Sequence, residues 1–339
     1  MRPFTYERAD SPEAATRLAA VPADAHVRAP VQFLAGGTTL LDLMKLDVMR
    51  PDRLVDINPL ADTRLGRIEA GEHGLRLGAL VRMAEAAEHP AVRRDYPVVA
   101  QALQQAASQQ LRNMASLGGN VLQRTRCPYF RDTSWPQCNK REPGSGCAAL
   151  GGVNRQHAVL GTNDRCIATY PGDLAQALVA LDAAVEVAGP NGARTLPFAS
   201  LHRPPGDTPH VETTLVPGEL ITALTVPAAP WTRRSLYLKV RDRASYEFAL
   251  ASAAVALDLA PDGMVREARI GLGGVATVPW RAREAEATLR GKRLDEAVAE
   301  SAAEAAFAGA RTYEHNAFKV PLGKSTLVRA LLQAAAMEV

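Results

Sequence analysis

The sequence predicts an α+β protein in which antiparallel strands come in groups with helices between them. Short apolar and β-branched runs flank turn signals such as Gly189-Pro190-Asn191-Gly192, a pattern typical of hairpins. Other stretches space apolar residues at the interval of an α-helix. Together these two patterns indicate strands and helices packed as an α+β protein.

The first half of the chain predicts a unit of alternating strands and helices, followed by a hairpin and a long helix. Residues 1–60 indicate strand, helix, strand, glycine turn, helix and strand, with Ser11-Pro12-Glu13 beginning the first helix. A hairpin follows over 66–80. A long helix is expected over about 95–116, where apolar residues recur at helical spacing.

The second half predicts a helix over 172–184, a hairpin and a strand over 221–226. The segment Pro227-Ala228-Ala229-Pro230 has the composition of a linker. A further antiparallel sheet with a Pro-Asp-Gly turn follows, and three helices are expected near 281–290, 294–311 and 322–337. We therefore expect one domain over 1–226, with subdomains of about 1–60 and 61–226, and another over 227–339.

Composition excludes several classes of protein. The 339 residues are 47% hydrophobic and carry a formal net charge of +3, from 39 basic and 36 acidic residues. So small a charge, without Lys/Arg runs among aromatic residues, argues against nucleic-acid binding. The first residues lack the apolar core and the twin arginines of export signals, and no stretch reaches the ~18 apolar residues of a membrane helix. We expect no signal peptide and no membrane insertion.

All four cysteines of the chain lie within 40 residues, at Cys127, Cys138, Cys147 and Cys166. Two disulfides would suit an exported protein. A structural zinc would use four thiolates, although the usual C-x2-4-C knuckles are absent. An iron–sulfur cluster accepts four thiolates from a long irregular loop, and the prolines and glycines between these cysteines favour such a loop. Spacing alone leaves the three readings open.

Two glycine pairs are candidate phosphate-binding turns. Gly36-Gly37-Thr38-Thr39 precedes an amphipathic helix, and Gly118-Gly119-Asn120 follows the long predicted helix. Backbone N–H groups at such a turn can approach an anion closely. Either pair alone would be better explained as a tight turn or a helix cap. Their occurrence in one chain, ahead of an acidic turn at 170–173, favours a phosphate-bearing cofactor.

These motifs together resemble the FAD-binding (medium) subunits of the xanthine dehydrogenase/molybdenum hydroxylase family. The segments that carry the resemblance are FLAGGTTLLDLMK, QLRNMASLGGN, ATYPGDLAQALVALDA, YLKVRDRASYEFALASAAV and GLGGVATVPWRAREAE. The resemblance implies a two-subdomain FAD-binding domain of the p-cresol methylhydroxylase/vanillyl-alcohol-oxidase type, followed by a C-terminal α+β domain of the CO-dehydrogenase-flavoprotein type. The cysteine segment is similar to that of the FAD subunits of periplasmic aldehyde oxidoreductases. It implies a [4Fe-4S] cluster in an insertion over about 124–166, bound by the four cysteines.

The resemblance also implies the residues that bind noncovalent FAD. The first turn would hold the pyrophosphate, through Phe33, Leu34, Ala35, Gly36, Gly37, Thr38, Thr39 and Leu40. Ser116 stands where the family often has Thr, and Gly119 and Asn120 would lie against the phosphate or ribityl part. Asp173 would accept hydrogen bonds from cofactor hydroxyls, and Lys239 would approach the isoalloxazine ring.

The function implied is that of an electron-transfer subunit of an oxidoreductase, with no acid–base catalytic residue in this chain. Aldehyde oxidation would occur on a large molybdenum subunit of a heterotrimer. Electrons would pass through a small [2Fe-2S] subunit to FAD here and on to an external acceptor, without NAD. The alternatives are the matching subunit of a hydroxybenzoyl-CoA reductase and, in another class, a zinc-stabilised ligand-binding protein. We expect a periplasmic location by co-export with a partner that carries a twin-arginine signal, or otherwise a cytoplasmic one.

Overall fold

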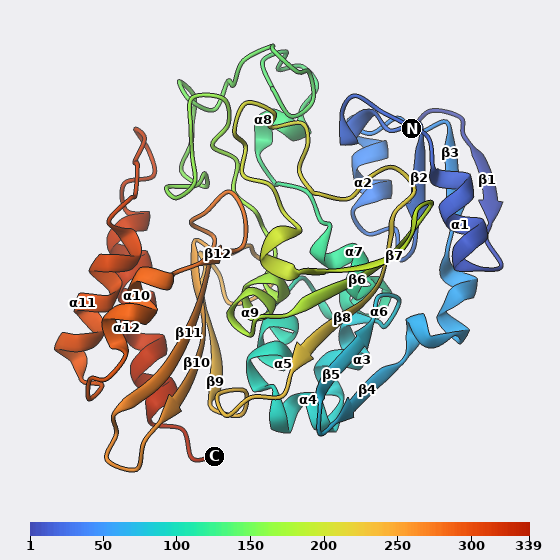
Figure 1. Cartoon of the computed structure of the whole chain (residues 1–339). Coiled ribbons are helices and arrows are strands. Elements are labelled where there is room, and N and C mark those ends of the chain that lie inside the picture. Colours follow the sequence, from blue (N-terminus) through green and yellow to red (C-terminus); the bar gives the residue numbers. More distant parts are fainter.

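The computed structural model describes all 339 residues, which form three β-sheets with helices packed against them (Figure 1). The first sheet has the order β1-β3-β2. Its elements are β1 (Thr5–Arg8), α1 (Pro12–Ala19), β2 (Val31–Leu34), α2 (Leu40–Lys45) and β3 (Arg53–Asp56). The element order predicted for 1–60 is confirmed. The pairing differs from the prediction, because these strands run parallel: a helix crosses over between successive strands, which permits parallel pairing.

The second sheet is antiparallel and joins segments far apart in the sequence. Its order is β4-β5-β8-β6-β7, with β4 (Ile68–Gly71), β5 (Gly74–Gly78), β8 (Leu220–Pro227), β6 (Ala184–Gly189) and β7 (Gly192–Pro197). Both predicted hairpins are therefore confirmed. Every residue of α9 (Leu174–Ala180) is buried, so this helix lies at the centre of the largest apolar core.

The long helix predicted over 95–116 is wrong: the chain forms short helices there. Two helices, α5 (Pro97–Gln104) and α6 (Gln109–Met114), lie in this range, and two more, α3 (Met83–Glu88) and α4 (Pro90–Asp95), come before it. Pro97 begins a new helix, since proline lacks the N–H needed inside one. Ala107 then adopts a positive φ of 49°, and the Ser108 hydroxyl accepts the Leu111 N–H at 3.3 Å, which caps the start of α6.

The third sheet forms the C-terminal part, as predicted. Its order is β12-β11-β10-β9, with β9 (Ser235–Val240), β10 (Ala251–Leu259), β11 (Val265–Gly273) and β12 (Trp280–Arg281). The three predicted helices are α10 (Arg283–Leu289), α11 (Glu296–Phe307) and α12 (Lys319–Ala335). Helices α10 and α12 contact this sheet, as do α5 and α9, and Figure 1 shows the two pairs on opposite faces.

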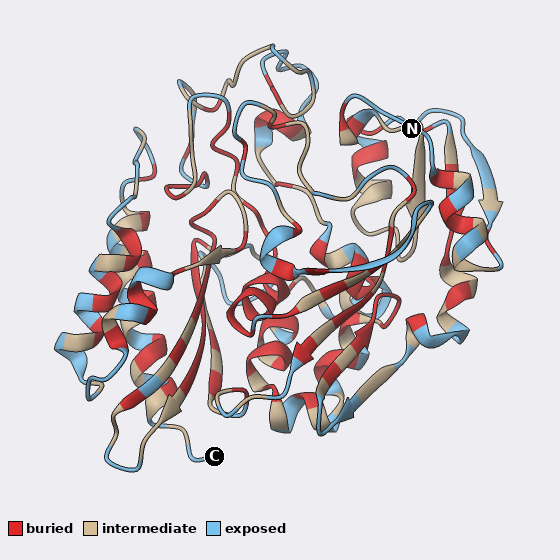
Figure 2. Cartoon of the chain, in the orientation of Figure 1, coloured by how far each residue is buried: buried red, intermediate tan, exposed pale blue.

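The four cysteines lie in an extended segment of little regular structure, which we call the cysteine segment (residues 124–166). It contains one short helix, α8 (Pro128–Arg131), and isolated bridges that pair Cys138 with Cys147 and Asn163 with Cys166. The segment lies at the top of Figure 1, and Figure 2 shows exposed and buried residues mixed along it, in contrast to the largely buried strands below. Short 3-10 helices occur at His26–Arg28, Asn58–Asp62, Arg64–Gly66 and Phe198–Ser200. None of the helices combines the length and hydrophobicity that spanning a bilayer requires.

Candidate cofactor cavity and cysteine cluster

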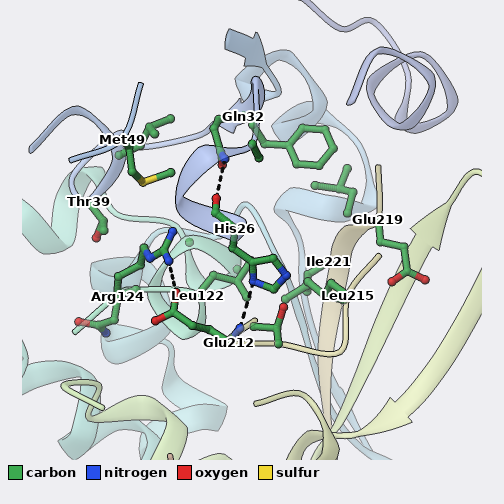
Figure 3. Close-up of a pocket in the computed structure, with 18 of the residues that line it drawn as sticks. His26, Gln32, Thr39, Met49, Leu122, Arg124, Glu212, Leu215, Glu219 and Ile221 are labelled. Carbon is green, nitrogen blue, oxygen red and sulfur yellow. Dashed lines mark hydrogen bonds and ion pairs between the residues drawn. The ribbon is translucent and has the colours of Figure 1, made fainter. Parts of the chain in front are cut away.

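A cavity of about 610 Å³ lies between the first sheet, α7 (Leu117–Val121) and the proline-rich loop before β8 (residues 201–219). Its volume falls within the roughly 300–1,000 Å³ of ordinary cofactor pockets. Figure 3 shows side chains from these separate segments turned toward it, among them Thr39, Arg124 and Glu212. The predicted cofactor residues that line it are Phe33, Ala35, Gly36, Gly37, Thr38, Thr39, Leu40, Ser116 and Gly119. The structure thus brings the two glycine motifs to one cavity.

Gly36 explains why the two motifs can meet. A Cβ built on Gly36 would lie 2.0 Å from the carbonyl oxygen of Met114, so the first turn packs directly on the backbone that leads to Ser116. Gly37 adopts a φ of 72°, which only glycine adopts without strain. Two glycines are therefore needed for different reasons, one for close approach and one for its backbone conformation.

The second glycine motif is helical, which corrects the prediction of a turn. Gly118, Gly119 and Asn120 lie inside α7, and the Ser116 hydroxyl accepts the Gly119 N–H at 3.3 Å as its cap. Two predicted residues near these motifs lie outside the cavity. Asn120 donates its Nδ2 hydrogen to the Met83 sulfur at 3.3 Å, and Leu34 packs against the apolar cluster around α2.

Asp173 and Lys239, which were predicted to contact FAD, also lie outside this cavity. They form a buried ion pair, with Lys239 Nζ 2.8 Å from Asp173 Oδ2. The Tyr237 hydroxyl donates to the other carboxylate oxygen at 2.6 Å. Burial raises the pKa of Asp173, against the opposing pull of Lys239. Through these contacts Asp173, at the start of α9, is linked to two residues of β9.

A charged group forms part of the cavity wall and was not predicted as part of the site. Glu212, from the proline-rich loop, pairs with Arg124 and accepts a hydrogen bond from Lys140 Nζ at 3.0 Å. Burial alone would raise the pKa of Glu212, but Arg124 and Lys140 outweigh it and hold the pKa at about 2. His26 Nδ1 accepts the backbone N–H of Glu212 at 3.2 Å (Figure 3). The concentration of His and acidic residues in HRPPGDTPHVE was the available sequence signal.

The net charge of this wall suits a cofactor with phosphates. Two cations and one anion leave one positive charge at this wall, with side chains of Arg124, Lys140 and Glu212 only 9%, 12% and 18% exposed. Elsewhere the lining holds one more cation, Arg203, and two more anions, Asp24 and Glu219, so the positive charge is local to this wall. Open backbone at the glycine turn and a cationic wall are both features that hold a pyrophosphate. The residues present therefore fit FAD.

The four cysteines are free thiols that influence one another electrostatically. Burial raises the pKa of Cys127 to about 12, and the neighbouring Cys166 and Cys138 add to that rise. Burial likewise raises the pKa of Cys166 to about 11, although Lys140 opposes it. The His157 ring Nε2 lies 3.2 Å from the Cys127 sulfur. No three His, Cys, Asp or Glu side chains lie close enough together to hold a single metal ion.

His202 gives the cavity wall a dependence on pH. Its Nε2–H donates to the Val121 carbonyl at 2.9 Å, and its ring packs edge-on against Tyr170. Burial lowers the pKa of His202 to about 4. In the unfolded chain the pKa of His202 is near 6.5, so the unfolded state binds the proton more readily than the folded state. The neutral ring therefore contributes its full stability to the fold above about pH 6.5, and this contribution is lost toward pH 4.

We therefore expect the free energy of unfolding to fall between pH 8 and pH 5, with about 1–2 kcal/mol of the fall coming from His202. Denaturant unfolding of the parent and of His202→Gln at both pH values measures this contribution, because the amide keeps the N–H donor and cannot titrate. An equal fall in the two proteins would contradict the assignment.

Comparison with known proteins identifies the class to which this fold and cavity belong. The family model for the FAD-binding domain in molybdopterin dehydrogenase matches residues 2–229. The model for the CO dehydrogenase flavoprotein C-terminal domain matches residues 236–334. The chain belongs to the family of FAD-binding subunits of molybdenum hydroxylases.

Particular relatives agree with this assignment. The chain is 50% identical to the aldehyde oxidoreductase FAD-binding subunit PaoB of Escherichia coli (strain K12), over 99% of both chains. It is 27% identical to the carbon monoxide dehydrogenase medium chain of Afipia carboxidovorans, over 77% of this chain and 73% of the relative. The solved carbon monoxide dehydrogenase from Hydrogenophaga pseudoflava superimposes with a TM-score of 0.75 at 26% identity, covering 99% of this chain and 98% of that one. This chain is thus an oxidoreductase subunit and a homologue of such medium chains.

Proposed function

We propose that this chain is the electron-transfer flavoprotein subunit of a molybdenum-dependent aldehyde oxidoreductase. The observation that carries the proposal is the convergence of the Gly36–Thr39 turn, Ser116 and Gly119 on one cavity in a chain of this family. The 50% identity to an aldehyde oxidoreductase subunit supports the aldehyde as substrate class. The same relative is the reason that a hydroxybenzoyl-CoA reductase subunit is not favoured.

Within this proposal the chain's own residues bind and orient the cofactor. The glycine turn presents backbone N–H groups to the pyrophosphate, Thr38 and Thr39 add hydroxyls, and Arg124 with Lys140 supplies positive charge. Ser116 holds the first turn of α7 in place through Gly119. Bound FAD supplies the redox chemistry, and no side chain of the cavity needs to act as an acid or base.

We propose further that the four cysteines bind a [4Fe-4S] cluster. The family models describe FAD and flavoprotein domains, so this proposal depends on the cysteine segment itself. Four free thiols from one irregular segment are suitable ligands for a cluster. Arg141 donates hydrogen bonds to the carbonyls of Tyr129 and Phe130 at 2.7 and 3.0 Å, which fixes the loop between Cys127 and Cys138. A single zinc fits less well, because its bond lengths would place the thiolates within about 4 Å of one another.

The partners proposed are a small [2Fe-2S] subunit and a large molybdenum-cofactor subunit, which together with this chain would form a heterotrimer. Medium chains of this family belong to multi-subunit enzymes, which supports the need for partners. We also propose that this chain functions in the periplasm after co-export with a partner that carries a twin-arginine signal. Export in the folded state would protect four free cysteines that an oxidising compartment would otherwise pair.

Metal analysis and a visible spectrum of the anaerobically purified complex test the two cofactors together. We expect flavin peaks, a broad iron–sulfur shoulder and about four additional iron atoms assigned to this chain. Cys166→Ser should lower the iron of this chain by most of that amount, because a buried ligand is lost and its replacement binds iron poorly. The control is Thr133→Ala, an exposed position in the same segment. Zinc without iron, or a Cys166→Ser protein with full iron content, would refute the cluster. A complex without flavin would refute the proposed function.

A further inference from the structure

The cysteine segment forms part of the FAD cavity as well as the metal site. Arg124, Thr125 and Lys140 all belong to this segment and all line the cavity, next to the proline-rich loop that contributes Glu212. The cysteine segment therefore contributes to both proposed cofactor sites. We propose that the ion group Lys140–Glu212–Arg124 links them, so that FAD affinity depends on the metal group held by the cysteines. This inference rests on the proposed function and adds a coupling that neither cofactor site requires.

Lys140 is held by the same loops that position the thiols. It follows Cys138 by two residues, and the intervening Asn139 binds two other parts of the segment. The Asn139 side chain donates to the Arg165 carbonyl at 2.9 Å and accepts the Gly146 N–H at 3.0 Å. Arg165 and Gly146 each directly precede a cysteine. A group that crosslinks the cysteines therefore also fixes the backbone of Lys140.

Lys140 in turn fixes the opposite wall. Its ammonium group donates to Glu212 at 3.0 Å and to the Pro209 carbonyl at 3.2 Å. Glu212 also pairs with Arg124, and the guanidinium of Arg124 lies over the Phe130 ring. These charges are buried, so displacing Lys140 would leave Glu212 with one partner fewer in a poorly solvated place. Such a loss is far more disruptive than at the surface.

A second contact ties the segment to the glycine turn. Asp42 lies in α2, which begins at Leu40, directly after the turn. Its carboxylate pairs with Arg126, directly before Cys127, at 3.1 Å and with Arg131, the last residue of α8, at 2.8 Å. Order in the cysteine segment is thus transmitted to two separate walls of the cavity. Coupling of binding sites is reciprocal, so bound FAD should also favour retention of the metal group.

FAD titration of the full-length chain, followed by flavin fluorescence, tests the link. We expect Lys140→Met and Cys138→Ser each to raise the FAD dissociation constant by at least about tenfold, within the usual range of coupling free energies. The double variant should be no weaker than the weaker single variant, because both changes break the same link. Arg165→Met is the matched control, because it removes a cation next to Cys166. The ion-pair partner of Arg165 is Asp207, whose side chain is 95% exposed, so the FAD dissociation constant of this variant should stay within about twofold of the parent value.

The inference is overturned if Lys140→Met binds FAD as tightly as Arg165→Met, or if the two single effects multiply in the double variant. If Lys140→Met does not fold, amide hydrogen exchange of the parent with and without FAD tests the link instead. The link requires that FAD increase the protection of amides 138–147, and unchanged protection overturns it. Iron measured on the same samples separates the proposals. A parent without iron refutes the cluster and with it the metal dependence, whereas an iron-containing parent whose Cys138→Ser variant loses iron and keeps its FAD affinity refutes only the coupling.

Discussion

Gly36→Ala should yield a protein that is purified largely without flavin. The added Cβ would lie 2.0 Å from the Met114 carbonyl oxygen and 3.1 Å from the Ala115 Cα, and backbone atoms cannot rotate away as a flexible side chain can. The turn must therefore move away from the segment that leads to Ser116, which separates the two motifs that line the cavity. Overpacking of this kind costs about 1–3 kcal/mol. We expect the FAD dissociation constant to rise by about 5- to 150-fold if the strain is relieved at the cavity.

A matched control is Gly71→Ala at the end of β4. A Cβ there meets no atom within 4 Å, and Gly71 is not among the residues that line the cavity. FAD titration of both variants with circular dichroism as a check of folding measures the difference. A Gly36→Ala protein that is folded and retains stoichiometric flavin would show that the turn does not hold the cofactor.

The sequence predicted the local elements well where pattern and turn chemistry agree. The hairpins at Gly71–Gly74 and Gly189–Gly192 and the three C-terminal helices formed as expected, because each depends on near neighbours in the chain. The prediction of one helix over 95–116 was wrong because the helical spacing of apolar residues continues across the point where the helix is broken. The capping group of Ser108 and the positive φ of Ala107 determine that break, and neither alters the apolar pattern.

In the candidate site too, features set by consecutive residues could be predicted and features set by tertiary contacts could not. The glycine turn was identifiable because its conformation is written in a few consecutive residues. The wall formed by Glu212, Lys140 and Arg124 was not identified, since their contact joins residues that are 72 and 88 positions apart and depends on tertiary packing. Asp173 and Lys239 were assigned to FAD by resemblance alone. In the structure the two side chains form a buried ion pair, which also requires both residue types.

The buried Lys239–Asp173 pair predicts that Lys239→Met is strongly destabilising and does not act through FAD. The Lys239 and Asp173 side chains are 1% and 5% exposed, and Lys239 also donates to the Gln105 carbonyl at 3.0 Å, so it connects β9 with α5 and α9. Removing the ammonium group leaves a buried carboxylate with Tyr237 as its remaining side-chain donor. Loss of one partner of a buried pair typically costs about 3–5 kcal/mol. We expect the free energy of unfolding to fall by about that amount in denaturant titrations.

Two further variants separate this explanation from a role at the flavin. Lys324→Met breaks the exposed pair with Glu304, whose side chain is 69% exposed, and should cost less than about 1 kcal/mol. The double variant Asp173→Asn/Lys239→Met removes both charges and should recover part of the stability lost in the single variant, because no unpaired buried charge remains. Since neither residue lines the cavity, the folded double variant should bind FAD with the affinity of the parent. A Lys239→Met protein of parental stability that fails to bind FAD would contradict this explanation and place Lys239 at the cofactor site.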